Sequence, residues 1–132
     1  MTSLSRDPPV CYKVFMKLNR LVPILWTNNL DQTIEFYQRL LGFECQNRIE
    51  NWAVLKKDSV ELMLSLPNAH EPFDRIQFTG SFYFHPDNVV ELWQSLQDKA
   101  TVVYPLEDFD YGMREFAIRD NNGYILQSGQ EI

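Results

Sequence analysis

Hydrophobic and polar residues in the first half of the chain alternate in short runs around one longer helical stretch. Residues 20–27 have the pattern of a strand, and about 30–41 have apolar residues at helical spacing, with Asn28 or Asn29 as the N-cap and Gly42 as the stop. Three further runs with strand character follow at 43–48, 52–56 and 60–66. The pattern predicts the order βαβββ.

The same order returns after a connector, residues 67–73, that contains two prolines. A strand over 81–85 is followed by a helix that opens at Pro86 and runs to about Ala100. Three more strands are predicted over 101–104, 114–119 and 124–128, the last two joined by a turn at 120–123.

The whole pattern predicts an α+β fold of two βαβββ units, at about 20–66 and 80–130, whose curled mixed sheets surround a cleft. Both units belong to a single domain, residues 18–132. Residues 1–17 are an N-terminal arm in which Pro8 and Pro9 block a helix. The arm is either a disordered leader or a segment that packs across a neighbouring subunit.

Alternation within the strands separates apolar faces from mixed ones. Leu62, Leu64 and Leu66 share one face, as do Phe82 and Phe84, and these faces are expected to pack against the helices. The opposite faces mix Met, Tyr, Glu, Ser and His, which suits a half-buried concave surface better than a flat solvated one. An ordinary exposed face or a subunit interface is the alternative. By strand parity alone, the expected cleft lining includes Trp26, Met63 and Tyr83.

Charge and composition narrow the range of functions. The 12 basic and 18 acidic residues give a net charge of −6, which disfavours nucleic acid and suits a cationic ligand better. The apolar runs are too short to span a membrane, so we expect a soluble, cytoplasmic protein. Cys11 and Cys45 are expected to be free thiols.

Three segments carry a family resemblance: Val22 to Leu25, "NNLDQTIEFYQRLLGF" and "YGMREFAIRDNNGYILQ". In these segments the chain resembles the vicinal oxygen chelate superfamily, and within it the bleomycin resistance proteins most closely. The resemblance covers about residues 21–130. It implies paired βαβββ units, usually in a dimer, and a non-enzymatic function in which a planar or cationic, antibiotic-like molecule is sequestered in a dimer cleft.

The resemblance also allows a test for metal chemistry. Metal-dependent members of the superfamily hold a divalent ion with His, Gln or Glu from four strands, at positions that match Val22, Glu61, Ser81 and Gln127. Only Glu61 and Gln127 carry suitable side chains, whereas such sites need three or four protein ligands. We therefore expect no metal, no cofactor and no catalytic residue. A metal-dependent lyase, isomerase or dioxygenase with other ligands is the alternative, and a structural or regulatory homodimer is a third possibility.

Two aromatic residues match the stacking positions of the bleomycin resistance proteins: Trp52 in "NWAVLKKD" and Tyr111 in "DYGMREF". Aromatic faces stack on planar rings and attract cations. For Trp52, a place in the hydrophobic core is the alternative interpretation. Acidic residues next to Tyr111 either draw a cationic ligand or form a solvated loop. The expected ligand-binding residues are Trp52, Tyr111, Glu61, Met63, Tyr83, Trp26 and Gln127. The expected partners are this ligand and a second copy of the chain, with no nucleic acid and no membrane.

Overall fold

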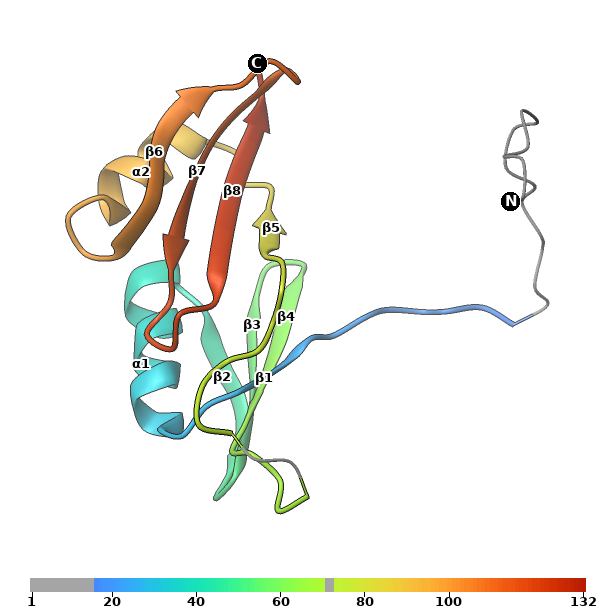
Figure 1. Cartoon of the computed structure of the whole chain (residues 1–132). Helices are drawn as coiled ribbons and strands as arrows, with labels where there is room; N and C mark the ends of the chain where they lie inside the picture. The colour runs from blue at the N-terminus through green and yellow to red at the C-terminus, as the bar shows by residue number, and fades with distance from the viewer. Residues whose placement is uncertain (1–15, 71–72) are drawn as a thin grey trace, which may run out of the picture.

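Each of two four-stranded sheets carries one helix in the computed structural model, which describes residues 16–70 and 73–132 (Figure 1). The first unit contains β1 (Ile24–Trp26), α1 (Leu30–Leu41), β2 (Glu44–Ile49), β3 (Trp52–Lys57) and β4 (Val60–Ser65). The second contains β5 (Phe82–Phe84), α2 (Val89–Leu96), β6 (Thr101–Asp108), β7 (Met113–Arg119) and β8 (Ile125–Glu131). The element order is that of the predicted α+β fold of two βαβββ units.

Strand order is the same in both sheets: β1-β4-β3-β2 and β5-β8-β7-β6. The pairs β1–β4 and β5–β8 are parallel and the remaining pairs are antiparallel. The two sheets remain separate and do not close into a barrel.

The predicted helix over 30–41 has the bounds of α1. The Asn29 side chain accepts a hydrogen bond from the Gln32 amide at 3.0 Å, and Gly42 ends the helix with a φ of 74°. Other boundaries differ from the prediction. The first strand is shorter than 20–27, since only Ile24–Trp26 pairs with β4. The second helix ends at Leu96 and not at Ala100, because the Lys99 and Ala100 amides both bond back to the Leu96 carbonyl as turns.

Strands β6 and β8 extend further than predicted, to Asp108 and Glu131, because β7 continues to pair with both of them beyond the alternating apolar run. The predicted arm, residues 1–17, lies outside the described residues except for Met16 and Lys17, as does Cys11. Cys45 is half-buried with a free thiol.

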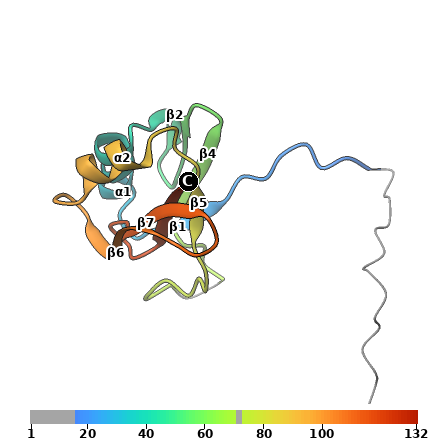
Figure 2. The same ribbon diagram turned by 90° about the horizontal axis from the view of Figure 1, so that it is seen from above.

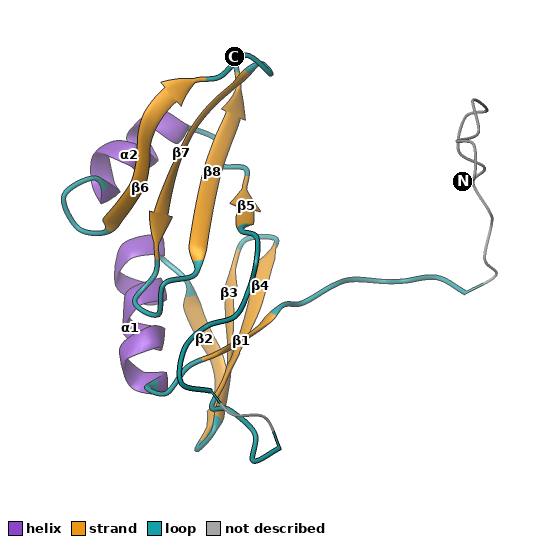
Figure 3. Ribbon diagram, viewed as in Figure 1, coloured by secondary structure: helices purple, strands orange, loops and turns teal. Residues whose placement is uncertain are grey.

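Both helices lie on the same side of the two sheets (Figures 1 and 3). Of the apolar strand faces predicted by parity, Leu62 and Leu64 are buried, and Leu66, Phe82 and Phe84 are half-buried against the core. Phe116, Ile118 and Leu126 of the second sheet are buried as well. Within residues 16–70 and 73–132, no helix lies over the opposite faces of the sheets, and the view from above shows the same one-sided arrangement (Figure 2). We call these two surfaces the open faces.

A polar junction holds the two units together at the β7–β8 turn. The Tyr37 hydroxyl, on α1, donates to Asp120 Oδ2 at 2.7 Å, and both residues are buried. Asp120 Oδ1 also accepts backbone amide hydrogen bonds from Asn122, Gly123 and Tyr124 at 2.8–3.0 Å. One carboxylate therefore shapes the predicted turn and anchors the helix of the other unit.

Candidate functional site

The open face of the second sheet carries a row of polar side chains across three strands. Cross-strand pairing places Tyr83 on β5 beside Gln127 on β8, and Gln127 beside Ala117 on β7. Because residues directly opposite each other project from the same face, Tyr83 and Gln127 share this surface. Glu115 precedes Ala117 by two positions on β7 and therefore lies on the same face.

Glu115 is the centre of the hydrogen-bond network on this face. Its carboxylate accepts hydrogen bonds from the hydroxyl of Tyr83 at 3.0 Å and from the hydroxyls of Tyr104 and Tyr111. Gln127 Nε2 donates to Glu115 Oε2 at 3.1 Å and to the Tyr104 hydroxyl at 2.7 Å. The Glu115 side chain is fully buried, and no Lys, Arg or His among the described residues forms an ion pair with it.

The pKa values reflect this arrangement. Burial acts to raise the pKa of Glu115, but the hydrogen bonds from Tyr104, Tyr111, Tyr83 and Gln127 outweigh it and lower the pKa below 4.5. Burial and the hydrogen bond to Glu115 raise the pKa of Tyr83 and of Tyr104 to about 12. At neutral pH the network therefore holds one negative charge that only neutral donors stabilise.

Acid should remove part of this stabilisation. The folded pKa of Glu115 lies below its unfolded value of 4.5, so the unfolded chain binds more protons in that window and stability falls as pH falls through it. We expect the unfolding free energy of the wild type to decline below about pH 4.5 more steeply than that of Glu115→Gln, measured by urea unfolding across a pH series.

The matched control is Asp120→Asn. Burial raises the pKa of Asp120 above 3.8 despite its hydrogen bonds, so its contribution changes with pH in the opposite direction. Parallel pH curves for the wild type and Glu115→Gln would contradict the charged network.

Gly129, opposite Glu115 in the β7–β8 register, makes room for the Tyr83 ring. A Cβ at this position would lie 1.9 Å from the Tyr83 hydroxyl oxygen and 2.6 Å from Cζ. Gly129→Ala should therefore displace Tyr83 from Glu115 and lower the unfolding free energy by about 1–2 kcal/mol. In a Tyr83→Ala background the same substitution should cost less than about 0.5 kcal/mol, measured as a double-mutant cycle. If Gly129→Ala lowered the unfolding free energy equally in both backgrounds, its clash would not be with Tyr83.

The open face of the first sheet is aromatic and apolar. Trp26, Ser65, Trp52 and Ile49 lie opposite one another across β1, β4, β3 and β2. Trp26 also contacts Phe73 of the connector, with ring centroids 5.9 Å apart. Ile49 is 56% exposed and Ile24, two positions before Trp26, is 54% exposed. Together these residues form an apolar patch that Phe73 covers in part at Trp26, with Met63 between them on β4 and half-buried.

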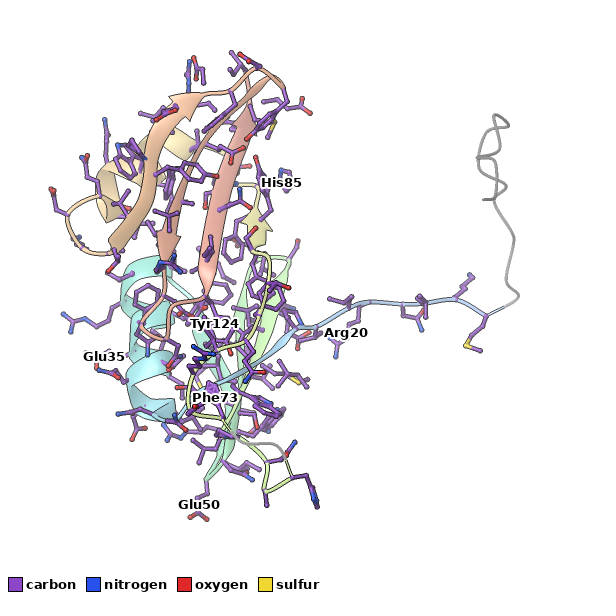
Figure 4. All side chains as sticks on the ribbon, in the orientation of Figure 1. Arg20, Glu35, Glu50, Phe73, His85 and Tyr124 are labelled. Atoms are coloured by element: carbon purple, nitrogen blue, oxygen red, sulfur yellow. The ribbon has the colours of Figure 1, made fainter. Side chains whose placement is uncertain are left out.

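Glu61 lies at the end of this face but is already paired. Its carboxylate accepts a hydrogen bond from Arg20 Nη1 at 2.5 Å (Arg20 is labelled in Figure 4). The expected ligand-binding residues thus fall into two groups. Tyr83, Tyr111 and Gln127 join the Glu115 network on the second sheet, whereas Trp26, Trp52, Met63 and Glu61 lie on the first. No hydrogen bond, ion pair or ring contact between described residues joins the two groups.

A metal fits poorly at the positions that the resemblance suggested. Ser81 donates its hydroxyl hydrogen bond to Gln127 Oε1, the atom that would have to bind the ion. Glu61 is on the other sheet and is bound to Arg20, and Val22 has no ligand atom. Among the described residues no three His, Cys, Asp or Glu side chains gather as a metal site. The residues at these positions therefore do not fit a metal ion.

Two members of the network, Glu115 and Tyr104, were not among the sequence predictions. The signal for Glu115 was present, since the alternation of "MREFAI" that buries Phe116 and Ile118 places Glu115 on the opposite face. The prediction placed the charge that attracts a ligand on the acidic residues near Tyr111 instead. Of these, Asp108 is neutralised by Arg114, whose Nε donates to Asp108 Oδ1 at 2.7 Å.

Comparison with known proteins decides the family. The sequence profile of the glyoxalase/bleomycin resistance protein/dioxygenase superfamily matches residues 17–127. The chain belongs to this superfamily. No curated protein sequence is significantly similar to it. Within residues 16–70 and 73–132, neither helix of this superfamily member is long and apolar enough to cross a membrane.

Solved structures share the superfamily fold at low sequence identity. A protein of unknown function from Agrobacterium tumefaciens str. C58 aligns with a TM-score of 0.75 and 16% identity, over 89% of this chain and 98% of that one. A bleomycin resistance determinant encoded on the transposon Tn5 aligns with a TM-score of 0.70 and 20% identity, over 86% and 98%. A lactoylglutathione lyase from Agrobacterium tumefaciens gives 0.67 and 20%, over 87% and 96%. The predicted fold class is confirmed.

Proposed function

We propose that this superfamily member is a non-enzymatic binding protein that sequesters a planar or cationic, antibiotic-like small molecule in a cleft between two copies of the chain. The observation that carries the proposal is the buried Glu115 carboxylate, ionised at neutral pH and bonded only by neutral donors, three of them tyrosines. Aromatic rings around an uncompensated negative charge favour a cationic guest.

The proposed cleft requires two copies of the chain, because the two groups of binding residues in one chain do not face each other. The Glu115 network and the Trp26–Trp52 patch lie on two separate sheets, and neither described helix lies on that side of them (Figure 3). Exposed Ile24, Ile49 and Tyr111 on and beside these open faces are typical of a surface that a partner covers. In the proposed dimer, the first sheet of one chain faces the second sheet of its partner, which brings Trp52 and Tyr111 to opposite sides of one ligand.

Titration with bleomycin and with smaller planar cations tests the proposal. The ligand should quench tryptophan fluorescence, and either Trp52→Ala or Tyr111→Ala should weaken binding by about tenfold or more, the usual effect of losing a stacking aromatic. Arg39→Ala, on the exposed side of α1, is the control and should bind as the wild type does. No quenching by any ligand of the panel would refute sequestration.

The proposal also concerns the location of the protein and its effect on drug tolerance in the cell. A cytoplasmic location suits the free thiol of Cys45, which is retained in a reducing compartment. A sequestering protein should raise the drug concentration that a sensitive host tolerates, without producing a modified drug. Conversion of the drug to a new product in the same assay would favour an enzyme instead.

A further inference from the structure

A cavity of about 450 Å³ lies between the two units, away from the open faces. Its walls come from the end of α1, the β3–β4 turn, the end of β5, the start of α2 and one residue of β8. The β8 residue is Ser128, which pairs with Phe84 and Phe116 on the helix-facing side of the second sheet. The second sheet therefore separates this cavity from the Glu115 network.

Ser128 is the unusual residue of this cavity. It is 4% exposed between Phe84 and Phe116, and the hydrogen bonds formed by the described residues include none to its hydroxyl. Among the described residues no side-chain polar atom that is sealed from solvent lacks a partner, so the Ser128 hydroxyl, which bonds to no described residue, opens into the cavity. Because Ser128 lines the cavity, a molecule inside it can supply the missing hydrogen bond.

The rest of the lining defines what kind of molecule fits. Leu41, Phe43, Phe84 and Leu92 provide an apolar wall. At the rim, Lys57 Nζ lies 3.5 Å from Asp58 Oδ2, so this cation is already paired. Asp87 and His85 also line the cavity (His85 is labelled in Figure 4), so the carboxylates of Asp58 and Asp87 face a single lysine there and disfavour an anion. The volume is within the range of small-molecule sites.

We propose that this cavity binds an uncharged small molecule with one or two apolar rings, whose hydroxyl or carbonyl oxygen hydrogen-bonds to Ser128. Such a guest contacts both units at once, from Leu41 in the first to Ser128 in the second. Since it binds only the folded arrangement of the two units, it stabilises the protein, and the unfolding free energy rises with the logarithm of its concentration above the dissociation constant. The site differs from that of the proposed function: His85 at its rim contacts the Tyr83 ring, with centroids 5.0 Å apart, but Ser128 lies on the helix-facing side of the sheet.

Titration calorimetry with 2-naphthol as the probe tests the site, with 2-naphthoate as its charged analogue. The wild type should bind 2-naphthol at least about tenfold more tightly than 2-naphthoate, since burying a charge without a partner is unfavourable. Ser128→Ala keeps the cavity but removes the hydrogen bond, and should weaken 2-naphthol binding by about five- to tenfold. Val60→Trp, at the exposed rim, should block entry and abolish binding.

Trp52→Ala, on the open face, is the matched control and should leave 2-naphthol binding unchanged, just as Ser128→Ala should leave bleomycin quenching unchanged. Absence of 2-naphthol binding to the wild type overturns the proposal. So does equal binding by the wild type, Ser128→Ala and Val60→Trp, or loss of binding in Trp52→Ala, which would move the probe to the open face.

Discussion

Glu115→Ala is expected to lower the unfolding free energy by about 2–4 kcal/mol, because it removes the single acceptor that four donors share. The half-buried Tyr104 and Gln127 lose most, whereas Tyr111 is 63% exposed and can bond to water instead. Loss of the buried charge offsets part of the cost, since its desolvation is no longer required. Urea unfolding at neutral pH measures the difference.

Smaller substitutions distinguish the loss of hydrogen bonds from the loss of side-chain volume. Tyr104→Phe should cost about 1–2 kcal/mol and Tyr111→Phe much less, because only the first hydroxyl is shielded from water. Glu115→Gln should fall between wild type and Glu115→Ala, since it keeps one acceptor but adds an amide donor among donors. A cost below about 1 kcal/mol for Glu115→Ala would mean that the tyrosine hydroxyls find other acceptors.

Asp120→Ala is expected to have an effect of about 3–5 kcal/mol, since it breaks the turn and the junction between the units together. The substitution leaves three backbone amides of the β7–β8 turn without their acceptor. It also leaves the Tyr37 hydroxyl, which is fully buried in the first unit, without its acceptor. Calorimetric unfolding should show a lower transition temperature.

Tyr37→Phe is the control for this prediction. It removes the hydroxyl but keeps the packed ring, and Asp120 retains its three amide partners, so the cost should be only about 1–2 kcal/mol. Similar costs for Asp120→Ala and Tyr37→Phe would show that the turn contributes little beyond the link to α1.

Helix-capping residues and the alternation of apolar residues in strands made much of the fold predictable from the sequence. The bounds of α1 follow from the Asn29 cap and from Gly42, whose positive φ favours glycine. Strand parity correctly assigned Leu62 and Leu64 to the core. Strand ends were harder to predict, because the length of β6 and β8 depends on pairing with β7 and not on their own residues.

The site was only partly predictable for a related reason. Parity gives the face of a residue but not its neighbours, so nothing in the sequence joined Tyr111 to Tyr83 and Tyr104, which lie on different segments and meet only at Glu115. Likewise Glu61 has the side chain of a ligand-binding residue, yet its partner is Arg20, 41 positions earlier. Whether Trp52 and Tyr111 belong to one cleft depends on how two chains meet.

Mixing two inactive variants tests that arrangement most directly. Trp52→Ala and Tyr111→Ala homodimers each carry a defect in both clefts, but a mixed dimer contains one cleft with both defects and one with neither. After unfolding and refolding the variants together, titration with bleomycin should therefore recover tight binding at one site per mixed dimer, while either variant refolded alone recovers none. No recovery in mixed dimers that are shown to form would contradict a cleft built from the first sheet of one chain and the second sheet of its partner.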